Sequence, residues 1–87
     1  MGLGLAVAPG AALADRAAAD RCAAGLQPLG KTLFERALPD ILRGTEVSTA
    51  LRTAALGLVM SGAVTRDAAR PAAEAAGACL SQVARPG

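Results

Sequence analysis

Alanine limits what this chain can fold into, because it accounts for 23 of the 87 residues while Phe34 is the single aromatic residue. Each buried alanine removes little apolar surface from water, so an alanine core contributes less stability than one of larger side chains. The part of the chain that we expect to fold, residues 15–87, is also short. A domain below about 70–80 residues is near the limit at which a hydrophobic core alone suffices. The sequence therefore predicts a fold that needs a further source of stability.

The distribution of alanine, leucine, glycine and proline predicts an all-α fold. Residues with branched Cβ atoms are scattered, no stretch alternates between apolar and polar residues, and glycine or proline separates the segments rich in Ala or Leu. We expect the second helix to kink or break at Pro39, because proline removes a hydrogen bond to the Glu35 carbonyl. The predicted architecture is a small bundle of about four short helices, over residues 16–24, 33–43, 46–61 and 65–84.

Polar residues at the segment boundaries predict where two of these helices begin. Thr32 followed by Glu35 has the pattern of a capping box, in which each side chain bonds to the backbone N–H of the other residue. This pattern leaves residues 27–31 as a loop. Thr45 is the expected N-cap of the third helix.

The third predicted helix is apolar on every face from Ala54 to Met60. Such a helix either lies at the centre of a bundle or presents one face to a partner, and the central position is favoured on general grounds. If one face is exposed, the candidate interaction face comprises Leu56, Leu58, Val59 and Met60.

The fourth predicted helix carries an apolar stripe at helical spacing and should bury it. The small residues Ala73 and Gly77 would let a neighbouring helix approach closely. The expected buried stripe comprises Ala69, Ala72, Ala76, Cys79, Leu80 and Val83.

The two cysteines, Cys22 and Cys79, lie in the first and last predicted helices. A disulfide between them would close almost the whole folded chain, and loop-closure entropy for so long a loop is worth about 4 kcal/mol. That bond would provide the missing stability, but it needs an oxidising compartment. The alternative is a pair of free, buried thiols in a cytosolic bundle. We favour the disulfide.

Residues 1–14 have the features of a truncated secretory signal peptide. An uncharged apolar run is followed by Ala12 and Ala14, which provide the small side chains that signal peptidase requires before its cleavage site. Cleavage after Ala14 leaves residues 15–87 as a single small helical domain. A signal peptide normally starts with a basic residue, so the gene is expected to begin further upstream. Alternatively, residues 1–14 form a disordered apolar arm.

Four residues, Gly25, Gly30, Lys31 and Thr32, match the P-loop pattern G-x-x-x-x-G-K-[ST]. A P-loop follows a buried strand of a parallel sheet, and its backbone N–H groups wrap around phosphates. Here the preceding residues predict a polar helix, and the chain is too short for a doubly wound sheet. We interpret the match as chance.

Most catalytic constellations cannot be assembled from this chain. It has no histidine, which excludes Ser–His and Cys–His nucleophile pairs. Two cysteines without histidine cannot complete a usual structural zinc site, and there is no haem-attachment motif. Arg16, Arg36 and Arg70 each precede an acidic residue by four positions, as expected for ion pairs on helix surfaces. We therefore expect no enzymatic activity, no metal and no cofactor.

The formal net charge of +2 comes from nine basic and seven acidic residues that are spread along the chain without a cluster. This distribution is too even for the electrostatic footprint of a nucleic-acid-binding protein. The preference for arginine over lysine, with abundant Ala, Gly and Pro, is typical of a bacterial gene rich in GC.

Three classes of function fit these observations. The preferred class is a secreted, non-catalytic module that binds an unidentified protein partner through an apolar helical face. The second is a membrane-active or lipid-binding helical peptide, although lysine is sparse and interfacial Trp and Tyr are missing. The third is a cytoplasmic helix-turn-helix protein. Its Arg66 and Arg70 would have to enter the major groove of DNA, although the acidic Asp67 and Glu74 lie beside them. The sequence leaves the oligomeric state open.

Overall fold

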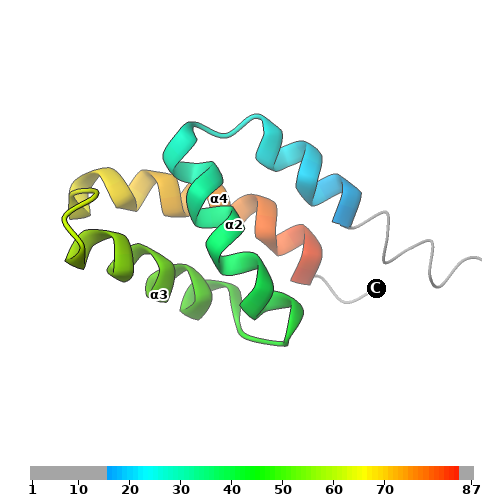
Figure 1. Cartoon of the computed structure of the whole chain (residues 1–87). Coiled ribbons are helices and arrows are strands. Elements are labelled where there is room, and N and C mark those ends of the chain that lie inside the picture. Colours follow the sequence, from blue (N-terminus) through cyan, green and yellow to red (C-terminus); the bar gives the residue numbers. More distant parts are fainter. Residues whose placement is uncertain (1–15, 85–87) are drawn as a thin grey trace, which may run out of the picture.

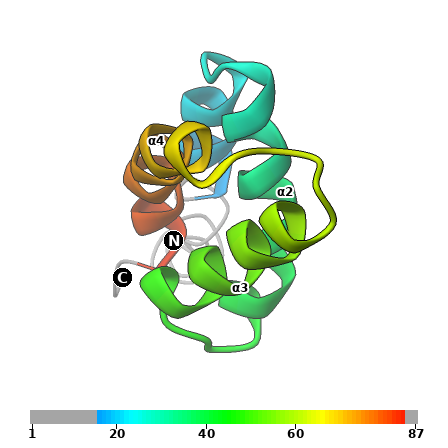
Figure 2. The same cartoon turned by 90° about the vertical axis from the view of Figure 1, so that its left-hand side faces the viewer.

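The computed structural model describes residues 16–84, and this part of the chain contains four helices and no strand. An N-terminal helix over residues 16–24 precedes α2 (Pro28–Leu42), α3 (Val47–Met60) and α4 (Arg66–Ala84). The N-terminal helix lies beside the C-terminal half of α4 (Figure 1), and α2, α3 and α4 surround a common interior (Figure 2). The predicted all-α bundle is thus confirmed, whereas the expected signal-peptide residues Ala12 and Ala14 lie outside the described residues.

The start of α2 differs from the prediction, because the helix begins at Pro28. Proline is well suited to the first turn, where its fixed φ fits the helix and its missing N–H has no partner to lose. The Lys31 backbone N–H already donates to the Gln27 carbonyl at 3.0 Å. The Thr32 hydroxyl donates to the Pro28 carbonyl at 3.1 Å and caps nothing. The expected loop over 27–31 and the capping role of Thr32 are therefore wrong.

Of the kink or break expected at Pro39, the break is absent, because α2 is one continuous helix through this residue. The helix ends at Leu42 with Arg43 as its C-cap, and Gly44 follows with a φ of 103°, in the left-handed region that favours glycine. The Gly44 N–H donates to the Ile41 carbonyl at 3.0 Å, and the Thr45 N–H donates to the Asp40 carbonyl at 2.9 Å. These two bonds form a Schellman motif, which satisfies the last carbonyls of the helix.

The start of α3 also differs from the prediction. Glu46, not Thr45, is the N-cap residue, and the helix begins at Val47. The Glu46 carboxylate accepts hydrogen bonds from the hydroxyls of Ser48 at 3.1 Å and Thr49 at 3.4 Å. The Ala50 backbone N–H donates to the Glu46 carbonyl at 2.9 Å, so the hydrogen bonds of α3 begin at Glu46, whereas Thr45 belongs to the turn that closes α2.

The start of α4 agrees with the prediction. The Thr65 hydroxyl oxygen accepts a hydrogen bond from the Ala68 backbone N–H at 3.1 Å, which is N-cap geometry. Asp67 lies in the first turn, where the helix dipole favours a negative charge. The helix then continues through Pro71.

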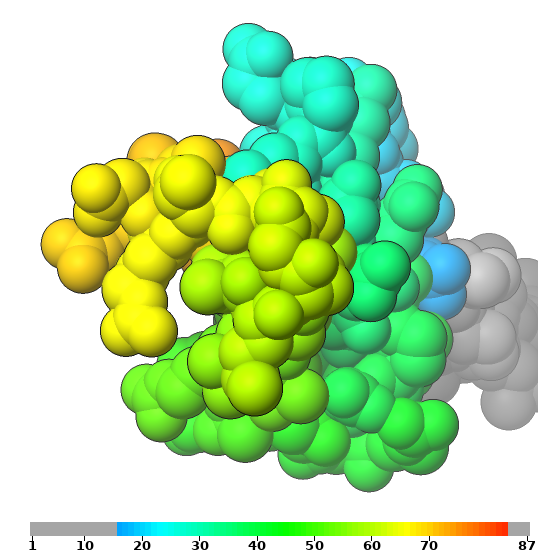
Figure 3. Space-filling model, turned by 60° about the vertical axis from the view of Figure 1, so that its left-hand side comes forward, coloured from blue at the N-terminus to red at the C-terminus, as the bar shows by residue number. Residues whose placement is uncertain are grey.

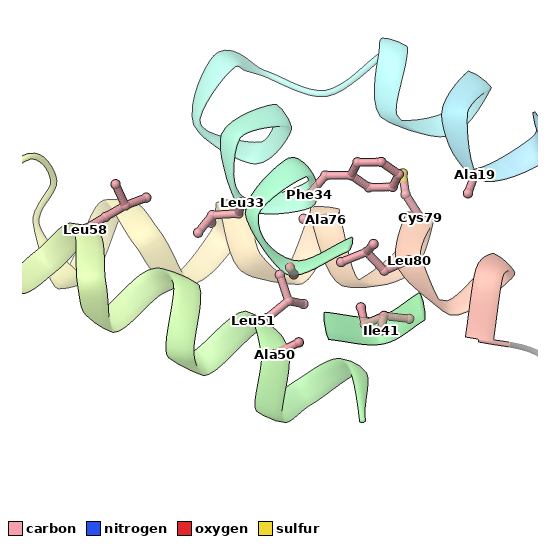
Figure 4. Packing of buried hydrophobic residues seen from close by; sticks show 11 residues of the cluster. Ala19, Leu33, Phe34, Ile41, Ala50, Leu51, Leu58, Ala76, Cys79 and Leu80 are labelled. Atoms are coloured by element: carbon pink, nitrogen blue, oxygen red, sulfur yellow. The ribbon is translucent and has the colours of Figure 1, made fainter. Parts of the chain in front are cut away.

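The core is thin, as the composition predicts. Leu33, Cys79 and Leu80 are the largest fully buried side chains, and Figure 4 shows Phe34 directed toward Cys79. Leu51 of α3 approaches α4 so closely that its Cδ1 lies 3.1 Å from the position of a Cβ at Gly77. The close approach expected at this small residue is therefore confirmed. Buried apolar residues come from all four helices: Ala19, Leu33, Phe34, Ala37, Ile41, Ala50, Leu51, Leu58, Ala69, Ala76, Cys79 and Leu80.

A disulfide joins Cys22 of the N-terminal helix to Cys79 of α4. The two Cα atoms are 5.4 Å apart, within the range that a disulfide spans without moving the backbone. The bonded residues are 57 positions apart in the sequence, so the bond encloses α2, α3 and most of α4 in one covalent loop. The predicted pairing of the cysteines is present in the fold.

Candidate functional site

The helix α3 is not central, although its apolar sequence favours that position. Leu58 is 8% exposed and belongs to the core, whereas Leu56 is 49% and Met60 is 76% exposed. Three helices around one interior leave each of them an outer face, so a helix that is apolar all round cannot be fully covered. Of the predicted interaction face, Leu58 is thus wrongly included, while Leu56, Met60 and the half-buried Val59 are at the surface.

An open groove of about 700 Å³ lies between the outer side of α3 and the N-terminal half of α4. Figure 3 shows the surface hollowed between the yellow beginning of α4 and the green α3. Its apolar lining consists mostly of alanine, with Leu56 and Val59 as the larger side chains. The apolar residues are Ala55, Leu56 and Val59 from α3, and Ala69 and Ala73 from α4.

Three arginines complete the lining of this groove: Arg52 from α3, and Arg66 and Arg70 from α4. All three are exposed. No carboxylate lines the groove, and the neighbouring acidic residues of α4, Asp67 and Glu74, lie outside its lining. The groove therefore combines an apolar floor with charge of one sign, in a chain whose net charge is only +2.

None of these three arginines forms an ion pair with a described carboxylate. Of the ion pairs expected from sequence, Arg16–Asp20 forms, with a distance of 3.5 Å between Nε and Oδ1. Asp40 pairs with Arg43 instead of Arg36. The expected pair between Arg70 and Glu74 is not formed within residues 16–84, which leaves the Arg70 guanidinium available at the groove.

Two smaller hollows differ from this groove in their charge. A hollow of about 330 Å³ between α2 and α3 has Glu35 and Asp40 beside Arg36. Another of about 230 Å³ between the N-terminal helix and α2 has Asp20 and Glu35 beside Lys31. Their own carboxylates oppose the neighbouring cations, whereas the α3–α4 groove offers positive charge without a counterion.

The residues of the P-loop-like match do not form an open loop. Gly25 follows the N-terminal helix, and Gly30, Lys31 and Thr32 lie in the first turns of α2. Gly30 is buried, and a Cβ placed on it would lie 3.3 Å from the Leu26 Cβ. This packing leaves no room for a phosphate at Gly30.

The sequence could not show this groove, because its walls come from two helices whose packing depends on the tertiary structure. Arg52 carried no signal by itself, being one of several scattered arginines. A weak signal was present in Arg66 and Arg70, which are one turn apart and therefore on one face of a helix. The exposed apolar residues of α3 were the part of the site that sequence could indicate.

The described residues contain no group of three or more His, Cys, Asp or Glu side chains that could hold a metal ion. Within the same residues, no helix has both the length and the apolar character needed to cross a membrane. Comparison of the chain with protein-family models, with curated proteins and with solved structures finds no match in any of the three. The geometry of the groove is accordingly the basis for assigning a function.

Proposed function

We propose that this protein is a small, secreted, non-catalytic binding module that holds a protein partner in the α3–α4 groove. The observation that carries the proposal is an apolar groove bordered by three arginines without described ion-pair partners. Although the core is thin, the large apolar side chains of Leu56 and Met60 lie at the surface and add nothing to it. Exposed apolar area next to polar residues is typical of protein-binding surfaces.

Secretion is supported by the disulfide and by the sequence of residues 1–14. The Cys22–Cys79 bond has ordinary Cα separation and would persist in an oxidising compartment. A domain of this size commonly depends on such a bond. The apolar run ending in Ala12 and Ala14 provides an independent reason to expect export.

The non-catalytic role is supported by the state of the hydroxyl groups. The hydroxyls of Ser61 and Ser81 donate to the carbonyls of Leu58 at 2.9 Å and Gly77 at 2.8 Å, within or at the end of their own helices. The Ser48 hydroxyl donates to the Glu46 carboxylate. Without histidine, none of these serines can form a Ser–His nucleophile pair.

A protein partner is favoured over the other two classes by the shape and position of the site. The groove is concave, whereas a bilayer surface is met by a projecting apolar face. DNA binding is opposed by Asp67 and Glu74, which are exposed on α4 beside Arg66 and Arg70 and would repel the phosphates. A helical surface of a partner protein could place apolar side chains on the floor of the groove and polar side chains beside the three arginines that form its rim.

The proposal is tested by placing a photocrosslinking amino acid at Leu56, in the groove, and in a second variant at Ala75, an exposed position of α4 outside the groove. Each variant is irradiated in the growth medium of the native source, and the adducts are identified by mass spectrometry. We expect one discrete protein adduct from position 56 that position 75 does not give. Lipid adducts alone, equal adducts from both positions, or no adduct from position 56 would overturn the proposal.

A further inference from the structure

We infer that the α3–α4 groove binds an amphipathic helix of the partner, with Asp or Glu residues flanking the apolar stripe of that helix. This inference rests on the proposed function and adds the chemistry of the partner to it. The conclusion follows from the small residues of the floor, the open shape of the groove and the charge of its rim.

The floor of the groove suits another helix. Ala55, Ala69 and Ala73 present only a methyl group each, so a third helix can approach the backbones of α3 and α4 closely. A small molecule or an acyl chain needs a site that encloses most of its surface, which an open groove does not provide. A helix lying between α3 and α4 would cover the floor by adding one more helix to the bundle.

The apolar contact extends beyond the floor along α3. Leu56 and Met60 are one turn apart on this helix, and both are exposed. The lining residues of α3 run from Arg52 to Val59, a distance of about 10 Å along the helix axis. The partner helix would therefore contribute two to three turns, with apolar residues at positions i, i+3, i+4 and i+7.

The rim sets the charge of the partner. Arg52 projects from one wall of the groove, and Arg66 and Arg70 project from the other. A helix between these walls has a guanidinium beside each of its edges, and carboxylates pair with guanidinium through two parallel hydrogen bonds. Arg66 and Arg70 also repel each other at i, i+4 spacing, which an intervening carboxylate would relieve. Acidic residues on both edges of the partner helix satisfy all three arginines.

The first experiment is a selection from a displayed peptide library on the immobilised, oxidised full chain. The library carries leucine at i, i+3, i+4 and i+7 and random residues at the flanking positions. We expect enrichment of Asp and Glu at the flanking positions. Selection on a chain with Arg66→Glu and Arg70→Glu should enrich Lys and Arg there instead. Selected sequences without acidic enrichment, or the same sequences from both chains, would overturn the inference.

The second experiment measures the affinity of one selected peptide by fluorescence anisotropy, and its contact site by NMR chemical-shift mapping. The double variant with Arg66→Glu and Arg70→Glu should weaken binding at least about tenfold, since two exposed ion pairs are replaced by repulsions. The variant with Arg21→Glu and Arg36→Glu, two exposed positions outside the groove, changes the net charge equally; it is the matched control and should leave the affinity within about twofold. Equal losses from both substitutions, or shifts away from Leu56 and Ala73, would overturn the inference.

These outcomes separate the inference from the proposed function. If position 56 crosslinks to a protein but the selected peptides lack acidic residues, the binding role stands and the acidic-helix inference fails. If vesicles of phosphatidylglycerol bind the chain while no peptide does, and the variant with Arg66→Glu and Arg70→Glu abolishes that binding, the groove serves a membrane and both fail.

Discussion

Reduction of the Cys22–Cys79 bond is the perturbation to which this domain should respond most strongly. The bond joins residues 57 positions apart, and the loop-entropy relation assigns about 4 kcal/mol to a loop of this length at 25 °C. A natural domain is stable by roughly 0.05–0.15 kcal/mol per residue, or about 4–10 kcal/mol for one of this size. Reduction should therefore remove a large fraction of the free energy of unfolding, and the alanine core gives little in reserve.

The assay is urea unfolding followed by far-UV circular dichroism, with the oxidised and reduced chains compared in the same buffer. Reduction keeps both sulfur atoms in place, so it isolates the effect of the covalent loop from any change in packed volume. A Cys22→Ala, Cys79→Ala variant is the second comparison and should be slightly less stable than the reduced chain, because Cys79 is buried. Oxidised and reduced chains that differ by less than about 1 kcal/mol would refute this account of the disulfide.

Three further predictions separate core, cap and turn residues, and each is checked by urea unfolding of the oxidised chain. Leu51→Ala should cost about 2–5 kcal/mol because Leu51 is buried, whereas Leu56→Ala in the groove should change the stability by less than about 0.5 kcal/mol. Thr65→Ala should cost about 1 kcal/mol through loss of the N-cap of α4, while Thr32→Ala should cost much less, since Thr32 caps no helix. Gly44→Ala should cost about 1–2 kcal/mol because its φ of 103° is unfavourable for a residue with a Cβ. Equal losses within either pair, or an unchanged Gly44→Ala, would contradict the corresponding assignment.

The features that the sequence predicts well are those set by local pattern. The spacing of glycine and proline predicts four helices, and the stripe on α4 predicts that Ala69, Ala76 and Leu80 are buried. The high alanine content predicts a thin core that needs a further source of stability, and the two cysteines are the available candidates. The bond between Cys22 and Cys79 then followed from their positions in the first and last helices.

The features that the sequence could not predict depend on competition between neighbouring signals or on tertiary packing. Thr32 and Glu35 have the pattern of a capping box, but α2 begins at Pro28, before both residues, at no cost in hydrogen bonds. Thr45 has the right chemistry for an N-cap, but the first hydrogen bond of α3 is accepted by the Glu46 carbonyl, one residue later. The groove could not be predicted because it depends on tertiary packing: Arg52 becomes a neighbour of Arg66 and Arg70 only when α3 packs against α4.

We propose that the domain works outside the reducing cytoplasm, where the Cys22–Cys79 bond persists. Intact mass spectrometry of the protein isolated from its native source, without reductant, tests this claim most directly. We predict a chain that lacks residues 1–14 and is lighter by two hydrogen atoms than its reduced form. A chain that retains Met1 and two free thiols would contradict the compartment, the covalent loop and the proposed secreted role together.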